Sequence, residues 1–509
     1  LLAEPEGSAA GDGPPLQGEP RPFEHTVKYY EKGERPLELV SNRQWFVRLL
    51  DKLEALIAKG EQIHWHPVHM GKRFRDWTEN LNSDWCVSRQ RYYGPAIPVW
   101  YPLDESGTRI FDAAIVAEPE QMPVDPMEDT PPGYQESQRN QPGGFEGEPD
   151  IFDTWFTSSM TPQISSHWSI DPGRHPTLFP ADVRPQAQDI IRTWAFYTIA
   201  KALLHEDSVP WHHATISGWI LDPDRKKMSK SKGNVVTPLP MIDKFTADGV
   251  RYWSGSARLG VDTAMDEKVY KIGKRLVTKI FNASKFVLSQ TAEVHPITAE
   301  LDRAFVSELR GLVEQTTESL EGFDHAHALM DTESFFWGRF TDTYIELTKT
   351  RARSEEAGEA AARGSAVAGL RLGLSALLRL FAPFMPYITE EVWSWAFAEE
   401  SGHSSIHRAS WPRVEELEEI AEPADAGSLE MAVLAQTAIN KAKAEAQVGM
   451  GREVESLTLA ATPATIERLR PVLSDVLAAT RCDEHRLTPR DDLEEETFEV
   501  AEARFVERD

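Results

Sequence analysis

The sequence predicts an α/β region followed by an all-α bundle and a small carboxy-terminal α/β module. An apolar, partly β-branched run at 214–221 is typical of a buried strand and leads into a basic loop. From Glu267 onward the apolar residues recur at helical spacing instead. An acidic linker follows at 415–422, and beyond it the pattern predicts a helix over 428–446, a strand over 454–461 and a helix over 464–480.

Length and composition limit the class of protein. A chain of 509 residues has room for about three or four domains, and a hydrophobic fraction of 41% excludes wholesale disorder. The two cysteines, Cys86 and Cys482, are far apart, which argues against a disulfide framework and fits a reducing, cytoplasmic location. No apolar run is long enough to predict a membrane span. The formal net charge of −27 disfavours nucleic-acid binding unless the basic residues are clustered.

The amino-terminal third carries weaker signals. Residues 1–20 are rich in Gly, Pro and Glu, so we expect them to be disordered or part of a truncated loop. Sequence patterns predict two strands over 25–30 and 37–40, and a helix over 47–58. Between 117 and 149, Pro, Gly, Gln and acidic residues predict a surface insertion with only local structure.

The most informative segment is the basic loop Lys227-Met228-Ser229-Lys230-Ser231, which follows the predicted strand and the turn Asp222-Pro223-Asp224. Small residues allow backbone N–H groups to approach an anion, and mobile lysines supply charge for a polyphosphate. Loops at the carboxyl ends of strands hold nucleotides in open α/β sheets. A solvated charged turn is the alternative, and that description fits Lys226 and Lys232.

Helical patterns surround this loop on both sides. Before it, a helix is predicted over 190–205 with Trp194 on its buried face. After it, one predicted helix carries an apolar stripe made of Val269, Ile272, Leu276, Ile280 and Ala283. Further helices are predicted over 302–321, 326–351, 364–381 and 387–398, the last two being separated by Pro383 and Pro386.

The loop resembles the signature Lys-Met-Ser-Lys-Ser of class I aminoacyl-tRNA synthetases. Segments 80–94, 153–156 and 184–194 look like the valyl-tRNA synthetase family, and the last of them differs from isoleucyl and leucyl enzymes. The resemblance runs from about residue 21 to about residue 412 and implies the second half of a Rossmann-like nucleotide-binding catalytic domain before an anticodon-binding bundle. The implied parts are an editing-insertion remnant (21–46), the catalytic half (47–266), the bundle (267–413) and a carboxy-terminal module with an acidic tail (414–509).

The resemblance implies ATP-dependent attachment of L-valine to tRNA(Val) through valyl-adenylate, by an enzyme that is monomeric at full length. ATP would arrive as its Mg²⁺ complex. Catalysis is then mostly positioning and stabilisation of charge on phosphate oxygens, for which Lys230 and Lys227 are the candidates. Residues implied to bind ATP also include Met228, Ser229 and Ser231 of the loop, with Gln186 and Asp189 at the adenylate ribose.

The resemblance implies two further sets of residues, one that binds the amino acid and one that binds the tRNA. Trp155, Ile190 and Trp194 are expected to form rigid apolar walls around valine, although a Trp at helical spacing is otherwise plain core. No acidic residue falls between Lys268 and Phe286. The basic residues expected to contact tRNA in this stretch are Lys271, Lys274, Arg275 and Lys279. An ordinary amphipathic helix with solubilising lysines is the alternative.

Metal binding is not expected. His64, His66 and His69 are interleaved with Trp65 and Pro67, which indicates an extended segment rather than a ligand helix.

The chain departs from the family pattern in two ways. No His-x-Gly-His motif precedes Lys227, and nearly all of an editing domain is missing. We therefore expect this chain to be the carboxy-terminal part of a larger enzyme, inactive without an amino-terminal half. Two other functions stay open: a non-catalytic tRNA-binding paralogue or subunit, and another large-aliphatic (isoleucyl or leucyl) tRNA synthetase.

Overall fold

The computed structural model describes residues 22, 24, 26–29, 35–37, 41–228, 233–290, 293–356 and 359–506. The chain divides into two compact units, Leu1–Asp51 with Asn82–Phe156 (unit 1) and Lys52–Leu81 with Thr157–Asp509 (unit 2). The predicted segment 1–20 and most of the two predicted strands near it lie outside the described residues. Within the described part of those strands, Tyr29 forms an isolated β-bridge with Pro36.

Unit 1 is built from short strands. β1 (Phe46–Val47) pairs with β3 (Trp85–Cys86), and β4 (Ser88–Arg89) pairs with β8 (Ile151–Phe152). β5 (Val99–Pro102) lies between β6 (Ile115–Val116) and β7 (Phe145–Gly147). The predicted insertion at 117–149 therefore contains a sheet strand near its end, and Phe145 of that strand is fully buried. The expectation that this insertion has only local structure was wrong here. Three residues are too few for alternation to mark a strand.

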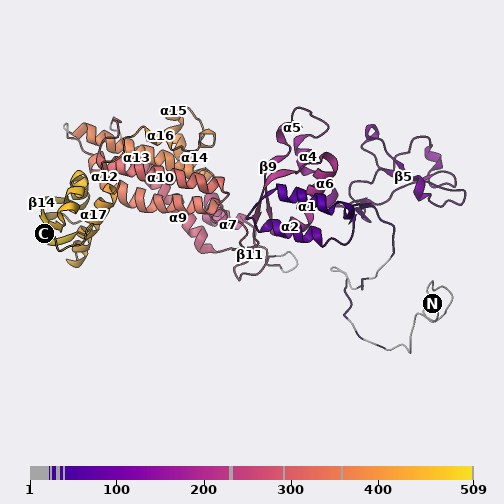
Figure 1. Ribbon diagram of the computed structural model, residues 1–509, viewed down its shortest axis with the longest axis horizontal. Coiled ribbons are helices and arrows are strands. Elements are labelled where there is room, and N and C mark those ends of the chain that lie inside the picture. Colours follow the sequence, from indigo (N-terminus) through magenta and orange to yellow (C-terminus); the bar gives the residue numbers. More distant parts are fainter. Residues whose placement is uncertain are drawn as a thin grey trace. The chain divides into compact units, whose positions relative to one another are not determined.

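Unit 2 begins with a parallel sheet in the order β2 (His64–His66), β10 (Trp211–Ser217) and β9 (Ala181–Ala187) (Figure 1). The predicted helix over 47–58 starts later, as α1 (Leu53–Gln62), after a 3₁₀ turn at Leu50–Lys52. α1 packs with α2 (Met70–Glu79) and with α6 (Phe196–Glu206), which follows a π-helical turn at Ile191–Ala195. As expected of a central parallel strand, β10 is buried at Ala214 and Ile216.

The strand predicted over 214–221 is interrupted. β10 ends at Ser217, and β11 (Ile220–Leu221) pairs with β12 (Thr263–Ala264) instead. The interruption lies at Gly218, where an added Cβ would stand 2.2 Å from the carbonyl oxygen of Val261. The backbone of 260–262 crosses there, and only glycine permits so close an approach.

The helical part follows the predicted order. It contains α7 (Leu239–Phe245), α8 (Ala247–Gly255), α9 (Glu267–Leu288), α10 (Glu300–Glu321), α11 (His325–Phe335), α12 (Ile345–Ala352), α13 (Ala360–Phe381), α14 (Pro386–Trp395) and α15 (Phe397–Ser401). A π-helical segment, Phe336–Tyr344, joins α11 to α12 without a break, so the single helix predicted over 326–351 is continuous. α13 is long and apolar enough to cross a membrane, but 72% of its most apolar stretch is buried, as in the core helix of a bundle.

The predicted apolar stripe of α9 is displaced. Leu276, Ile280 and Ala283 are buried as expected, but Ile272 is 41% exposed. Gly273 faces the core in its place, because an added Cβ would meet the Tyr252 side chain of α8 at 2.9 Å. The contact between α8 and α9 thus rotates the buried face of α9 away from Ile272.

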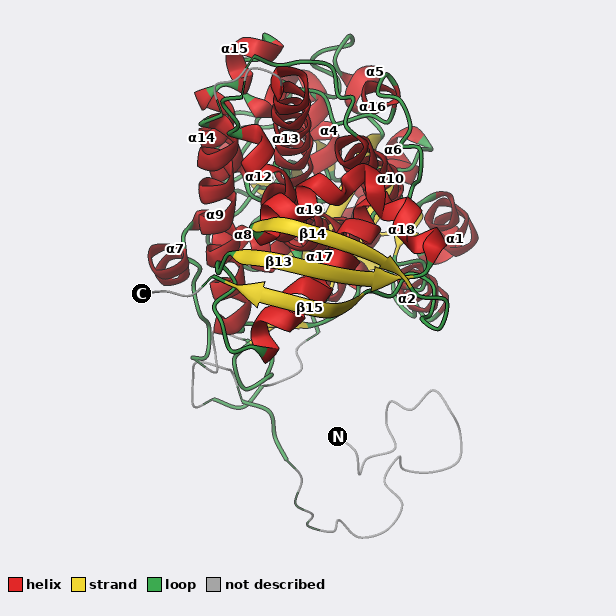
Figure 2. Cartoon of the chain, turned by 90° about the vertical axis from the view of Figure 1, so that its left-hand side faces the viewer, coloured by secondary structure: helices red, strands yellow, loops and turns green. Residues whose placement is uncertain are grey.

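The carboxy-terminal module packs helices on one side of a three-stranded sheet (Figure 2). Its elements are α16 (Glu415–Glu418), α17 (Ser428–Glu445), β13 (Val454–Ala461), α18 (Pro463–Leu469), α19 (Leu473–Thr480), β14 (Cys482–Pro489) and β15 (Glu499–Phe505). β13 is the central strand, parallel to β14 and antiparallel to β15. The single helix predicted over 464–480 is broken by a 3₁₀ turn at Pro471, which lacks an N–H for the helical ladder. One apolar core continues from the bundle into this module.

Candidate nucleotide and amino-acid site

One carboxylate organises the base of the basic loop. Asp222 accepts hydrogen bonds of 2.8 Å from the backbone N–H of Lys226 and 2.8 Å from the side-chain amide of Asn234. The Lys226 contact first, and then the Asn234 contact, hold the pKa of Asp222 below its ordinary value. Asp222 therefore joins the segment that enters the loop to the segment that leaves it.

Lys227 and Met228 lie at the start of the loop. The ammonium group of Lys227 is 4.1 Å from the centre of the Trp219 ring, a cation–π contact that restrains a flexible side chain. The sulfur of Met228 accepts a hydrogen bond of 3.5 Å from the backbone N–H of Val236. The other residues predicted for the loop, Ser229, Lys230, Ser231 and the neighbouring Lys232, lie outside the described residues. The role of Lys230 stays a prediction.

β9 brings Gln186 to the same carboxyl edge of the sheet, where it is paired in register with Ile216 of β10. Gln186 is 9% exposed, and within the described residues neither polar atom of its side chain has a hydrogen-bond partner. A buried amide without partners is unusual, which makes this group available to a ligand. Asp189 is exposed just beyond the strand. Contact of Gln186 and Asp189 with an adenylate ribose stays a prediction.

Asp262 holds two segments together at this edge of the sheet, and the sequence pattern did not indicate it as a site residue. Its carboxylate accepts hydrogen bonds of 2.8 Å from the backbone N–H of Trp219 and 3.1 Å from the side-chain amide of Gln188. It therefore links the segments that follow β10 and β9. Because its partners lie far away in the chain, no local pattern marks it.

Trp194 is part of the core of unit 2. It is 6% exposed, and its indole N–H donates a hydrogen bond of 2.9 Å to the carbonyl oxygen of Ser158. The Arg184 guanidinium lies 3.3 Å from the centre of its ring, and burial lowers the pKa of Arg184 to about 10. These contacts favour the alternative in which Trp194 is an ordinary core residue and not a wall of the amino-acid pocket. Of the other two predicted pocket residues, Ile190 is half-buried in unit 2 and Trp155 belongs to unit 1.

The basic residues predicted to bind tRNA lie on α9, but acidic and carbonyl groups partly engage them. Lys271 is 4.0 Å from Glu267, and Lys279 forms an ion pair of 3.0 Å with Asp342. Lys274 donates a hydrogen bond of 3.0 Å to the carbonyl oxygen of Lys244, whereas Arg275 is exposed. The stretch without acids in the sequence thus overstates the free positive charge of this face, because Glu267 at the start of α9 and Asp342 from another element both reach it.

Histidines gather on the parallel sheet. His66 of β2 lies 3.0 Å from His213 of β10, nitrogen to nitrogen, and the His64 and His213 rings stack 5.0 Å apart. The Phe323 ring stacks on His66 at 4.1 Å. The extended conformation predicted for the segment with His64, His66 and His69 is confirmed for the first two by β2. It is wrong for His69, which lies in the turn before α2 with helical backbone angles. Across the part of the chain that the structure describes, no three His, Cys, Asp or Glu side chains are placed to hold a metal ion.

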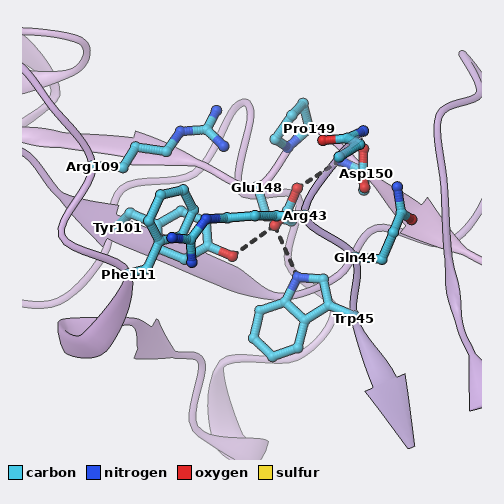
Figure 3. Close-up of a pocket in the computed structure, with 10 residues that line it drawn as sticks. Arg43, Gln44, Trp45, Tyr101, Arg109, Phe111, Glu148, Pro149 and Asp150 are labelled. Atoms are coloured by element: carbon cyan, nitrogen blue, oxygen red, sulfur yellow. Dashed lines mark hydrogen bonds between the residues drawn. The ribbon is translucent and has the colours of Figure 1, made fainter. Parts of the chain in front are cut away.

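Unit 1 contains a cavity of about 570 Å³ that the sequence did not indicate (Figure 3). The Glu148 carboxylate in its wall accepts hydrogen bonds of 2.9 Å from the Trp45 indole, 2.7 Å from the Tyr101 hydroxyl and 3.0 Å from the Asp150 backbone N–H. Burial and this carboxylate raise the pKa of Tyr101. With both oxygens engaged, Glu148 holds the wall in place and is a poor candidate for proton transfer.

Two family models match the chain. Residues 24–266 match tRNA synthetases class I (I, L, M and V), and residues 302–458 match the anticodon-binding domain of tRNA ligase. The chain is 49% identical over 475 residues to a valine–tRNA ligase of Thermobifida fusca, covering 92% of this chain and 53% of that protein. It is 44% identical over 501 residues to a valine–tRNA ligase of Leifsonia xyli subsp. xyli, covering 95% and 56%. The chain spans about half the length of these relatives.

A solved structure supports the fold. Methionyl-tRNA synthetase of Mycobacterium tuberculosis bound by methionyl-adenylate matches with a TM-score of 0.52 and 17% identity, covering 72% of this chain and 65% of that one. Together with the two family models, this match confirms the predicted fold class, an α/β catalytic region followed by a helical anticodon-binding domain.

Proposed function

Because this chain belongs to the class I tRNA synthetases, we propose that it is part of a valine–tRNA ligase, which joins L-valine to tRNA(Val) with ATP. One observation carries this proposal: the basic loop leaves the carboxyl edge of a parallel sheet with both ends joined by Asp222. That edge is where open α/β folds bind nucleotides. The choice of valine rests on the names of the relatives that share 44–49% of its residues.

In the proposed first step, the valine carboxylate attacks the α-phosphorus of ATP and pyrophosphate leaves with its bonding electron pair. The products are valyl-adenylate and pyrophosphate. Lys230 and Lys227 would stabilise the charge that develops on the phosphate oxygens, and the Trp219 ring would restrain Lys227 beforehand. Mg²⁺ would enter with ATP. The ribose of the terminal tRNA nucleotide then displaces AMP from the adenylate.

The residues at the sheet edge would orient the nucleotide. The free amide of Gln186 suits a ribose hydroxyl, because it can donate and accept hydrogen bonds. Asp189 would lie beside it at the start of the following turn, and Asp262 would hold the two adjoining segments at a fixed spacing. Ile190 and Trp155 remain our proposal for apolar walls around valine. For Trp194, whose contacts favour a core role, the pocket role remains the competing prediction.

The helical domain would carry the tRNA. Residues 302–458 match an anticodon-binding domain, and α9, with Lys271, Lys274, Arg275 and Lys279, would lie along the RNA backbone. We expect a cytoplasmic enzyme that is monomeric at full length. Since this chain covers only about half of its relatives, we expect it to form no valyl-adenylate by itself.

The test is ATP–pyrophosphate exchange in the full-length enzyme, with valine, isoleucine and leucine as separate substrates. We expect exchange with valine, lowered about 10²–10³-fold by Lys230→Ala, the scale for one oriented charge-stabilising group. Lys226→Ala is the matched control and should change the rate less than about threefold, because Lys226 is exposed and is expected to be a solvated charge only. Exchange driven by isoleucine or leucine would contradict the proposal, and so would a normal rate in Lys230→Ala.

A further inference from the structure

Arg184 is a half-buried cation of unit 2 that has no counter-ion among the described residues. β9 has seven residues, and Arg184 is the middle one. Its guanidinium lies 3.3 Å from the centre of the Trp194 ring. Its Nε is shielded from solvent and, in the part of the chain that the structure describes, has no hydrogen-bond partner.

The side chain of Arg184 belongs to the buried face of the sheet. Arg184 is paired in register with Ala214 of β10, and Gln186 is paired with Ile216. Ala214 and Ile216 are 1% and 0% exposed. Because alternate residues of a strand share a face, Arg184 and Gln186 are neighbours on this face, and both carry polar atoms without partners.

A charge in this position is unfavourable by itself. Burial lowers the pKa of Arg184 to about 10, so the group is still protonated at neutral pH. Stacking on Trp194 covers one face of the guanidinium but leaves the N–H groups at its edge without acceptors. Since buried charges in folded proteins are paired, Arg184 requires an acceptor beyond those that the described residues supply.

Another stacked arginine of this chain shows the usual arrangement. The Arg109 guanidinium lies 5.5 Å from the centre of the Tyr101 ring and donates hydrogen bonds of 2.6 and 2.8 Å to the two carboxylate oxygens of Glu146. Stacking and a bidentate carboxylate therefore occur together there. Arg184 has the stacking without the carboxylate.

The missing acceptor has room on one side of β9. Within unit 2, β9 is the edge strand of its sheet: β10 pairs with one side, and no described strand pairs with the other. Edge strands of parallel sheets are ordinarily covered by other segments. This chain spans about half the length of its relatives, so the longer enzyme has further segments available for that side.

A substrate is a poorer partner for Arg184 than a protein side chain. In open α/β sheets the nucleotide binds beyond the carboxyl ends of the strands. Arg184 lies three residues before the end of β9, which is about 10 Å along a strand. Its position favours a carboxylate that packs against the strand over one that arrives with a substrate at the basic loop.

We propose that Arg184 forms an ion pair with an Asp or Glu side chain from a part of the enzyme that lies outside this chain. The proposal rests on the proposed function, which makes this chain part of a longer enzyme. The planar guanidinium can hold a carboxylate with two parallel N–H donors while its face stays on Trp194. The pair would join the two parts of the enzyme next to Gln186 and the nucleotide edge.

The test compares Arg184→Met in this chain and in the full-length enzyme by thermal melting. Methionine keeps a flexible apolar side chain on Trp194 and removes the charge. In this chain the melting temperature should stay the same or rise, because an unpaired charge is lost. In the full-length enzyme it should fall by about 5 °C, because a buried carboxylate loses its cation. Arg184→Lys, which keeps the charge without the planar fork, should restore about half of that fall.

The matched control is Arg192→Met, which removes an exposed arginine 5.8 Å from the centre of the Trp77 ring. It should change either melting temperature by less than about 1 °C. Equal destabilisation of both proteins by Arg184→Met would mean that Trp194 or an acid of this chain holds Arg184, and would overturn the inference. An unchanged melting temperature of the full-length variant with a raised KM for valine or ATP would make Arg184 a substrate ligand and would overturn it too.

Labelling with phenylglyoxal, a reagent for arginine, gives a second measurement that needs no variant. Peptide mass spectrometry should find Arg184 modified in this chain and protected in the full-length enzyme, with Arg192 modified in both. Equal modification of Arg184 in the two proteins would contradict the ion pair. Valine-dependent exchange by the parent full-length enzyme tests the proposed function separately. Without exchange that function fails, whereas the melting temperatures still decide on the ion pair.

Discussion

Arg351 on α12 forms two hydrogen bonds of 2.8 Å with the carboxylate of Asp302 on α10, and Asp302 is fully buried. The same guanidinium pairs with Asp475 of α19 at 2.8 Å. The hydroxyls of Tyr344 and Ser365 donate the remaining hydrogen bonds to Asp302, at 2.8 and 2.6 Å. One arginine thus connects the bundle to the carboxy-terminal module through two buried acids.

Arg351→Ala should destabilise the protein by about 3–5 kcal/mol, because it leaves two buried carboxylates without their cation. Urea denaturation followed by circular dichroism would measure the loss. Arg470→Ala, which removes an exposed pair, should cost less than about 1 kcal/mol and serves as the control. A cost below about 1 kcal/mol for Arg351→Ala would mean that the two acids find other partners.

Asn234→Ala should slow adenylate formation in the full-length enzyme about 10–100-fold. The variant releases one end of the basic loop from Asp222, and small displacements of a positioning group are costly in rate. Stability should change little, because Asn234 is only half-buried. Asn80→Ala, which removes a local hydrogen bond to Asp76 at the end of α2, is the matched control. Equal rates in the two variants would contradict a positioning role for Asn234.

Trp194→Ala should lower stability by about 3–5 kcal/mol, the range for removing a large buried aromatic side chain. Trp194→Phe keeps most of the apolar contact and loses the hydrogen bond to Ser158, so it should cost about 1 kcal/mol for that bond. Thermal melting and valine-dependent exchange should be measured on both variants. A well-folded Trp194→Ala that has lost only valine activation would establish the pocket role instead.

The histidine cluster should make stability depend on pH. The pKa values of His66 and His213 are lowered, first by burial and then by neighbouring histidines. The unfolded chain therefore takes up protons at higher pH than the folded chain. The contribution of these two histidines to the free energy of unfolding is fully present above about pH 6.5, the ordinary histidine pKa. It is lost as the pH falls through their lower pKa values in the folded chain.

Melting temperatures at pH 8, 6.5 and 5 would measure this effect in the parent chain and in His66→Gln with His213→Gln. We expect the double variant to lose less stability between pH 6.5 and 5 than the parent chain. His403, which is exposed near α15, supplies the control His403→Gln. Parallel pH profiles for parent and double variant would rule out the cluster as the cause.

The sequence predicted elements whose pattern is local and strong. Apolar spacing located α10, α13 and α17, and the basic motif marked a segment whose two described ends are joined by Asp222. The sequence pattern did not predict contacts between distant segments. Nothing in the chain near Asp262 indicates that Trp219 and Gln188 are its partners. The contact at Gly218 that ends β10 depends on residues 43 positions later, at Val261.

β14 and β15 were missed for a different reason. Most side chains of β14 are exposed or half-buried, so no apolar alternation marks the strand. Its pairing with β13 stabilises it through the backbone, which the sequence pattern does not report. The cavity of unit 1 was missed for another reason, because its walls come from segments that meet only in the folded chain.

The acidic run Asp491-Asp492-Leu493-Glu494-Glu495-Glu496 looks like a removable tail, yet it connects β14 to β15. A gene shortened at this run would lose β15 and uncover one whole edge of β13, a strand with Val454 and Leu459 buried. Open edges of this kind recruit strands from other molecules and lead to aggregation. The shortest truncated form of the protein that does not aggregate should therefore extend through Phe505.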